Sequence, residues 1–435
     1  MRHSRKLLAL VISLVCAVAG VVGAQETPAE MDPLLELLVE QGVITEEQAR
    51  AVQAEYDRRR AAQATDEAAP PTPPPAPTPT PAVVETEKEE PKWHDRIDLR
   101  GDLRMRYEGF HQEGAYDDND QRHRVRLRIR PGIYADVTDW MEVGFQLRTG
   151  DPKDPVSDNQ SIDGGFSMKA IAISEGYAAF DATDWLDITI GKFDAKKKWV
   201  VTDMQWDDDV TVEGGMEELS FGPFEANLYQ FFLEEQGGGD DAYLLGGQLV
   251  GTFGSKSSGG FTVGVGYDDW VRPQLVADLT LSGELKGNKV TNLLDEENQL
   301  ISDFKIFNAF VNWSSTRNER WPIKFYLFGY HNAGAQGLGK DYDTGYFARL
   351  QVGDYKEKGQ LMFRYSRYYS EPDAIFYVFA QSDTTRASDV DGHRFDVRIG
   401  YVKRSYFNLT WYRTKAVYAD VSTMDRLQVD YIIRF

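Results

Sequence analysis

Nine consecutive residues, RHRVRLRIR at 122–130, place an arginine at every second position. Guanidinium groups hold carboxylates and phosphates through paired hydrogen bonds, so a row of them could hold or guide an anion. Successive side chains of a β-strand point to opposite faces, whereas a helix would scatter these charges around all its sides. The pattern therefore predicts a strand with one basic and one apolar face. The basic face consists of Arg124, Arg126, Arg128 and Arg130.

Three environments could suit such a strand: a nucleic acid, the wet face of a soluble sheet, or the lumen of a membrane barrel whose outer face meets lipid. The formal net charge of the chain is −21. Affinity for nucleic acid rests on the neutralisation of phosphates, so this acidity argues against a nucleic-acid partner. The rest of the sequence must distinguish between a soluble sheet and a membrane barrel.

The first 24 residues have a basic start, an apolar run from Leu7 and small residues up to Ala24. This composition predicts a signal peptide at 1–24, with a retained membrane anchor as the alternative. Cys16, the single cysteine of the chain, lies in this segment. The mature chain is thus expected to lack disulfides and cysteine metal sites. No later segment is apolar for the length of a membrane helix, so a membrane location would require strands.

Residues 25–92 differ in composition from the rest. Two short helices are predicted within 25–64, the second with Thr45 and Gln48 as a capping box. The segment 65–92 reads as a linker, because eight prolines fall within 70–81 and such runs form semi-rigid spacers. We expect a periplasmic helical segment on a spacer, which could contact peptidoglycan, pack as an oligomer or bind another partner.

From Trp93 to the end the hydrophobic pattern has a period of two, which predicts an all-β transmembrane barrel over 93–435. Sixteen antiparallel strands are expected. They lie near 96–110, 122–130, 141–150, 170–182, 185–194, 210–221, 224–235, 242–254, 261–270, 304–315, 323–333, 346–356, 360–370, 393–403, 407–417 and 425–435. Short connections such as Thr138-Asp139-Trp140 alternate with long ones such as 151–169 and 371–392. Short turns at one end and long loops at the other are typical of outer-membrane barrels.

The sequence ends in DRLQVDYIIRF, which places Leu427, Val429, Tyr431, Ile433 and Phe435 on one face. Chain ends usually fray, so an apolar face that runs to the last residue is unusual in a soluble protein. In a barrel this strand would close against the first one, with its apolar face in lipid. We therefore expect Phe435 to act as a signal for the barrel-assembly machinery, and the arginines of the second strand to face the lumen.

Several pieces of the chain resemble the bacterial "putative porin" family of outer-membrane proteins. They are WHDRIDLRGDLRMRYE at 93–108, RHRVRLRIR, WDDDVTVEGG at 206–215, AIFYVFAQSD at 374–383 and DGHRFDVRIGY at 391–401, together with the leading LLELLVEQGVITEEQA. The resemblance implies a sixteen-stranded porin in the outer membrane of a Gram-negative bacterium. It implies no catalytic residues.

A barrel of sixteen strands is wide enough for an aqueous channel, and the predicted constriction has two sides. The basic wall consists of Arg100, Arg104, Arg106, Arg124, Arg126, Arg128 and Arg130. The third loop carries Asp151, Asp154, Asp158 and Asp163 and could fold inward opposite this wall. Alternatively, the arginines pair with Asp98, Asp102 and Glu108 on the neighbouring strand and only hold the wall together. Both interpretations remain open.

Other polar residues give weaker signals. The clusters Asp207–Asp209 and Asp295–Glu297 are expected in outer loops, either as solvated charge or as ligands for Ca²⁺ or Mg²⁺ that bridge to lipopolysaccharide. The histidines show no metal-ligand spacing, so no cofactor or metal is predicted. There is no G-x-S-x-G motif and no apparent triad, so no enzyme is predicted.

Three functions follow from these expectations. The leading prediction is a porin for passive diffusion of small hydrophilic solutes and ions. A substrate-specific, anion-preferring channel comes second, and a tether between the outer membrane and the cell wall third. The expected partners are outer-membrane lipid and lipopolysaccharide, with a homotrimer as a candidate assembly.

Overall fold

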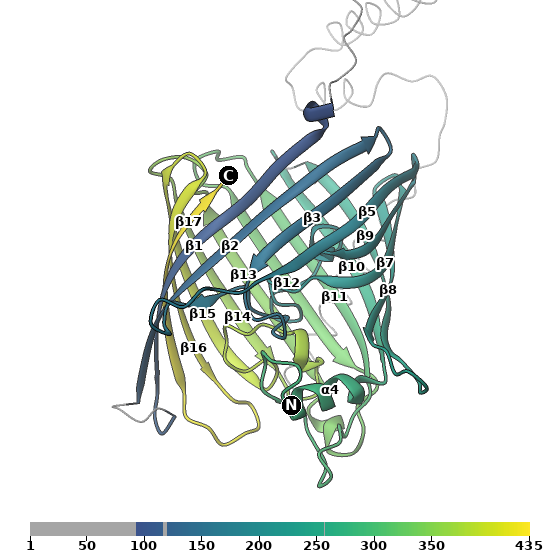
Figure 1. Ribbon diagram of the computed structural model, residues 1–435, viewed down its shortest axis with the longest axis vertical. Helices are drawn as coiled ribbons and strands as arrows, with labels where there is room; N and C mark the ends of the chain where they lie inside the picture. Colours follow the sequence, from purple (N-terminus) through teal and green to yellow (C-terminus); the bar gives the residue numbers. More distant parts are fainter. Residues whose placement is uncertain (1–92, 116–119, 256) are drawn as a thin grey trace, which may run out of the picture. The chain divides into compact units, whose positions relative to one another are not determined.

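The computed structural model describes residues 93–115, 120–255 and 257–435. The predicted signal peptide, the helical segment 25–64 and the linker 65–92 lie outside the described residues. The alternating pattern from Ile97 onward folds into one continuous antiparallel sheet that closes into a barrel (Figure 1). Among the described residues, no helix is both long and apolar enough to cross a membrane.

The barrel wall consists of sixteen strands in chain order, in agreement with the number predicted. They are β1 (Ile97–Gln112), β2 (Gln121–Thr138), β3 (Met141–Thr149), β5 (Ile171–Thr183), β6 (Leu186–Phe193), β7 (Val212–Phe221), β8 (Phe224–Glu234), β9 (Ala242–Ser255), β10 (Gly259–Val271), β11 (Phe304–Ser315), β12 (Ile323–Asn332), β13 (Thr344–Gly353), β14 (Leu361–Ser370), β15 (Val390–Val402), β16 (Ser405–Lys415) and β17 (Met424–Arg434). The two-residue strand β4 (Gln160–Ser161) belongs to a loop and pairs with β2. The second strand runs on to Thr138, well beyond the arginine stretch from which it was predicted.

The barrel closes where β1 meets β17. The register runs from Asp102 opposite Arg434 to Gln112 opposite Met424. Beyond it, the backbone of Gly101 and that of Phe435 exchange two N–H···O bonds of 3.1 and 3.0 Å. An atom added to Gly101 at the Cβ position would lie 2.6 Å from the Phe435 ring, so glycine lets this ring cover the seam. Closure leaves no free strand edge in the wall.

The connections alternate in length, as predicted. One end of the barrel carries the short turns 139–140, 184–185, 222–223, 257–258, 316–322, 354–360 and 403–404. The other end carries the loop residues 113–115 and 120 and the loops 150–170, 194–211, 235–241, 272–303, 333–343, 371–389 and 416–423. Helix α4 (Pro273–Ser282) lies among these loops (Figure 1). The short 3₁₀ helices are η1 (Trp93–Arg96), η2 (Ala195–Lys197), η3 (Gly337–Asp341) and η4 (Tyr377–Phe379).

The two faces of the strands differ as the pattern requires. Outward apolar side chains are exposed, for example Leu99 at 66% and Val125 at 43%, whereas the inward Arg128 is 7% exposed. A sheet with an apolar outer face and a polar inner face suits a barrel in lipid. Within the stretch 122–130, Val125 thus lies on the exposed face and Arg128 on the buried face.

Part of the interior is filled by aromatic side chains from loops. Trp206 of loop 194–211 stacks on Phe379 of loop 371–389, with ring centres 5.9 Å apart, and on Trp270 at the end of β10, at 5.6 Å. Trp199 and Phe376 belong to the same buried cluster. Two long loops thus share an apolar core with the inner surface of the wall, and aromatic residues supply most of its buried area.

The contact at the seam yields a first prediction. We expect Phe435→Ala to deplete folded protein from the outer membrane, because the ring covers Gly101 where the first and last strands close. The amount of protein in membrane fractions and its heat-modifiable mobility on gels measure this effect. Phe325→Ala is the matched control, because Phe325 is also an exposed outward phenylalanine but lies on β12, away from the seam. Equal levels of both variants would contradict the prediction.

Candidate functional site

The inner wall brings arginines from two distant parts of the sequence to neighbouring strands. β1 and β2 supply the arginines predicted from the sequence, and Arg104 lies opposite Arg128 in their register. On the other side of the seam, β13 to β17 add Arg349, Arg364, Arg394, Arg398, Arg426 and Arg434. So many cations side by side repel one another unless anions lie between them.

A first set of arginines holds Asp209 of loop 194–211. The carboxylate of Asp209 accepts hydrogen bonds from Arg128 at 3.1 Å and Arg130 at 3.4 Å, and from the backbone N–H of Asp158 at 3.1 Å. Burial alone would raise the pKa of Asp209, but the cations of Arg128, Arg104 and Arg130 hold it below its usual range. Asp209 thus stays charged and ties its loop to the wall.

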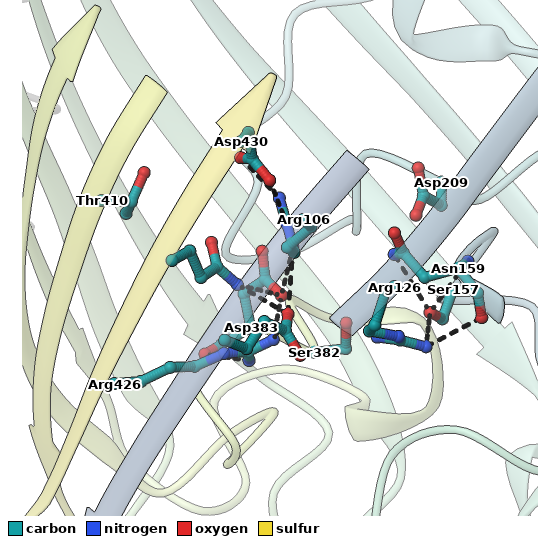
Figure 2. A network of polar contacts seen from close by, with 12 residues as sticks. Arg106, Arg126, Ser157, Asn159, Asp209, Ser382, Asp383, Thr410, Arg426 and Asp430 are labelled. Carbon is teal, nitrogen blue, oxygen red and sulfur yellow. Dashed lines mark hydrogen bonds and ion pairs between the residues drawn. The ribbon is translucent and has the colours of Figure 1, made fainter. Parts of the chain in front are cut away.

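A second pair of arginines holds Asp383 of loop 371–389. Figure 2 shows this carboxylate between Arg106 of β1 and Arg426 of β17, at 3.5 and 2.8 Å. Arg106 also binds Asp430 at 2.6 Å, and Arg426 binds Glu108 at 2.7 Å. The network therefore crosses the seam of the barrel and fixes the loop against it.

A third pair of arginines holds Asp203, which lies between Trp199 and Trp206 in loop 194–211. Its carboxylate accepts hydrogen bonds from Arg349 at 2.6 Å, Arg394 at 3.1 Å and the Tyr368 hydroxyl at 3.0 Å. The backbones of the two loops also meet, since Asp207 N–H donates to the Phe379 carbonyl at 2.8 Å. Three aspartates, each between two wall arginines, thus anchor two loops inside the barrel.

The four acids predicted in the third loop do not act together. Asp158 meets the wall, at 3.3 Å from Arg130 and 2.8 Å from Arg148. Asp154 binds the N–H of Val156 in its own loop. Asp151 pairs with Lys286 at 2.6 Å, and Asp163 lies 3.8 Å from Lys169 on an exposed part of the loop.

The pairing with acids on the same strands is also present. Asp102 lies within 2.9 Å of Arg128 and 2.6 Å of Arg130, and Arg100 binds Asp98 at 2.5 Å near the short-turn end. Arg124 pairs with Glu108. Most of the predicted arginines therefore have carboxylate partners, either on the wall or on a loop.

Two of the predicted arginines have no carboxylate within ion-pair distance in the described part of the chain. Arg104 donates to the Asn159 side chain at 2.6 Å. Arg126 donates to the Ser157 hydroxyl at 3.1 Å and to the Asn159 carbonyl at 2.9 Å, as Figure 2 shows. In both side chains Nε is buried without a hydrogen-bond partner. These two guanidinium groups therefore interact with the neighbouring carboxylates only at distances longer than an ion pair.

Two polar cavities remain between the loops and the wall. One of about 600 Å³ lies among residues of the short-turn end, including Asp139, Glu142 and Asp181. The other, of about 360 Å³, is lined by nine cationic and six acidic side chains. Asp194 and Lys197 line both, so the cavities are neighbours. We call the second one the arginine cavity.

The structure corrects one expectation about the outer loops. Asp207 and Asp209 are buried inside the barrel, and only Asp208 of this cluster is exposed. Asp295–Glu297 is exposed, and Asp295 accepts hydrogen bonds from the N–H groups of Glu297 and Gln299. No group of three or more His, Cys, Asp or Glu side chains among the described residues is arranged to hold a metal ion.

Sequence reasoning missed the second half of the basic wall. Arg394, Asp396 and Arg398 alternate with Phe395 and Val397, which is the pattern that identified the second strand. It also missed the anchoring role of loops 194–211 and 371–389. The tryptophans and phenylalanines in these loops could have indicated that the loops are buried, because solvent-exposed loops rarely contain several large aromatic side chains.

The closed antiparallel barrel, its sixteen strands and its polar interior define the class as porin-like, which implies an outer-membrane protein of a Gram-negative bacterium. Residues 110–278 match the family model described as "Putative porin", which confirms the resemblance found in the sequence.

A solved structure shows the same fold, and others match with lower scores. OprB of Pseudomonas putida at high pH matches with a TM-score of 0.52 at 11% identity, over 78% of this chain and 94% of that one. An anion-selective porin from Comamonas acidovorans matches with a TM-score of 0.45 at 13% identity, over 78% and 99%. The OmpT loop-deletion mutant of Vibrio cholerae gives 0.44 at 10%, over 78% and 99%. The comparison with curated proteins found no match.

The anchoring of Asp209 yields a second prediction. We expect Asp209→Asn to lower the temperature of heat modification, since removing one partner of a buried ion pair costs roughly 3–5 kcal/mol. Because the pKa of Asp209 is depressed, its stabilisation is complete above about pH 4 and is lost as the pH falls further. Asp163→Asn, at an exposed position, is the control. Equal transition temperatures at neutral pH would show that Asp209 does not anchor its loop.

Proposed function

We propose that the protein is an outer-membrane channel for passive diffusion of small hydrophilic solutes and ions. The observation that carries this proposal is the closed sixteen-stranded barrel with an apolar outer face and a charged inner face. A wall of this size encloses more space than its own side chains fill. The inward loops then set the width of the passage and the charges that a solute meets.

The route that we propose runs past the arginine cavity. Aromatic side chains and loops occupy the interior next to β8–β13, where the buried cluster includes Phe231, Phe304 and Phe347. The arginine cavity lies against β1, β2 and β15–β17. A solute would therefore pass between the basic wall and loops 194–211 and 371–389, without any catalytic residue.

A preference for anions is the second part of the proposal. The lining of the arginine cavity holds more cationic than acidic side chains, although the chain as a whole is acidic. Charges farther than about one Debye length, roughly 8 Å at physiological salt, are largely screened. The lining should therefore outweigh the acids of distant loops in the choice of ion.

The other assignments remain proposals that need separate tests. The N-terminal segment would lie in the periplasm, where it could contact peptidoglycan and tether the membrane. The barrel-assembly machinery, lipopolysaccharide and further copies of the chain in a homotrimer are the other proposed partners.

The direct test is electrical. We expect the purified full-length protein to form long-lived, ohmic channels in planar bilayers, because a barrel of sixteen strands is wide and charged side chains line the arginine cavity. If the protein is folded, as shown by heat-modifiable mobility, but gives no current in bilayers, the channel proposal would be overturned and the tether favoured.

A pair of variants separates charges that select ions from charges that hold the fold. Arg126→Gln should shift the reversal potential in a salt gradient toward cations with little loss of stability, because no carboxylate of the described residues lies within ion-pair distance of Arg126. Arg128→Gln should lower the heat-modification temperature, because it leaves Asp102 and Asp209 with one arginine fewer. An unchanged reversal potential in Arg126→Gln would show that this residue is not part of the filter.

A further inference from the structure

We propose that the arginine cavity contains a binding site for small oxyanions, formed by Arg104, Arg398 and Arg434 on the inner wall. This inference adds a ligand class to the proposed channel function. The role of the site in transport rests on that proposed function. It would bind inorganic phosphate or the carboxylate of a small organic acid on the way through the barrel.

The first observation is that three arginines of this cavity lack acidic partners. Arg104, Arg398 and Arg434 all line it, and none lies within ion-pair distance of a carboxylate in the described part of the chain. Arg398 donates to Asn408 at 3.1 Å and to the Tyr355 hydroxyl at 2.9 Å. Arg434 donates to the Tyr406 hydroxyl at 3.4 Å. Most of their N–H groups therefore remain for a ligand.

The second observation is that two of these arginines are close together. The guanidinium carbons of Arg398 and Arg434 lie 5.7 and 5.4 Å from the centre of the same Tyr406 ring. Arg104 lines the same cavity from β1, two strands away from Tyr406 in the sheet register. The two cations beside Tyr406 repel each other, and an anion between them would remove that repulsion.

The third observation concerns Arg104, which is only 8% exposed. Its Nε is buried without a hydrogen-bond partner, and its one hydrogen bond is to the neutral side chain of Asn159. A buried guanidinium with an unused donor is costly, and an anion that accepts from it would offset part of that cost. Arg434 is exposed and Arg398 half-buried, so the three side chains lead from the short-turn end into the cavity.

The acids of the same cavity do not neutralise this cluster. Asp209, Asp383 and Asp430 are bound by other arginines, and Asp194 lies 2.9 Å from Lys196. Burial and the neighbouring carboxylates of Asp209 and Asp383 raise the pKa of Asp207 well above its usual range, so it adds little charge. Asp208 is the exposed acid of the lining and lies on the loop side.

The chemistry favours oxyanions over chloride. Guanidinium donors are planar and fixed in direction, and they match the paired oxygens of a carboxylate or phosphate. The Tyr355 and Tyr406 hydroxyls could add neutral hydrogen bonds around the same ligand. A cavity of about 360 Å³ admits a small oxyanion with some water.

The test uses the full-length protein in planar bilayers with about 0.1 M chloride, where charges are screened over about 10 Å. Inorganic phosphate should reduce the chloride current in a saturable way, and acetate serves as the carboxylate probe. Saturation by either one supports the site. A current that changes only in proportion to the added ion, for both probes, would overturn it.

The variants are designed to separate binding from folding. The double variant Arg398→Gln/Arg434→Gln should raise the half-saturating phosphate concentration about tenfold or more, because two charge-assisted contacts are lost. Arg104→Gln alone should give a smaller rise in the half-saturating phosphate concentration. It replaces the double variant in this test if the double variant does not fold. Arg413→Gln is the matched control, since Arg413 is an exposed arginine on the outer face of β16. Wild-type saturation in the double and Arg104 variants would overturn the assignment.

Calorimetric titration of phosphate into detergent-solubilised protein gives a readout that does not need conduction. Saturable binding that weakens in Arg398→Gln/Arg434→Gln, from protein that leaves bilayers silent, would support the site while removing the channel. Open channels without saturable binding would remove the site and leave the proposed channel intact.

Discussion

The pairing of buried charges inside the barrel is the constraint on which the rest of the structure depends. The inner wall carries too many arginines to remain bare, and the loops bring Asp203, Asp209 and Asp383 into the gaps between them. Each aspartate lies between two arginines, so it reduces the repulsion between them. The attraction to both cations offsets the cost of removing the carboxylate from water. If the loops left, water would solvate both partners, so anchoring needs the aromatic contacts of Trp206 and Phe379 as well. Charge positions the loops, and the apolar core holds them.

The wall could be predicted almost completely, because it depends on a local rule. Once one face of each strand meets lipid, the period of two fixes which side chains face the lumen and how neighbouring strands pair. The turns at Thr138 and Thr183 and the closure between β1 and β17 followed from the same rule. The ends of the strands were predicted less accurately: the second strand was predicted to stop at Arg130, but β2 continues through Pro131 to Thr138 because β1 pairs with it as far back as Ile97.

The interior could not be predicted in the same way, because its contacts join residues far apart in the sequence. Arg128 and Asp209 are 81 positions apart, and Arg349 and Asp203 are 146 apart. No periodic pattern links such pairs, and an acidic run such as Asp207–Asp209 looks the same whether it is solvated or buried. The loop aromatics were the one local sign that these segments leave the solvent.

The pairing also changes how the arginine-rich stretch should be understood. As a list of residues, the second strand suggests a strong positive field along its whole length. In the structure, Arg124, Arg128 and Arg130 are neutralised by Glu108, Asp102 and Asp209, and they serve mainly to build the wall. In the channel that we propose, the field that a solute meets would come instead from the arginines that have no carboxylate within ion-pair distance among the described residues. Because these side chains are few and lie on different strands, selectivity in that channel would depend on which carboxylates the loops supply, more than on how many arginines the strands contain.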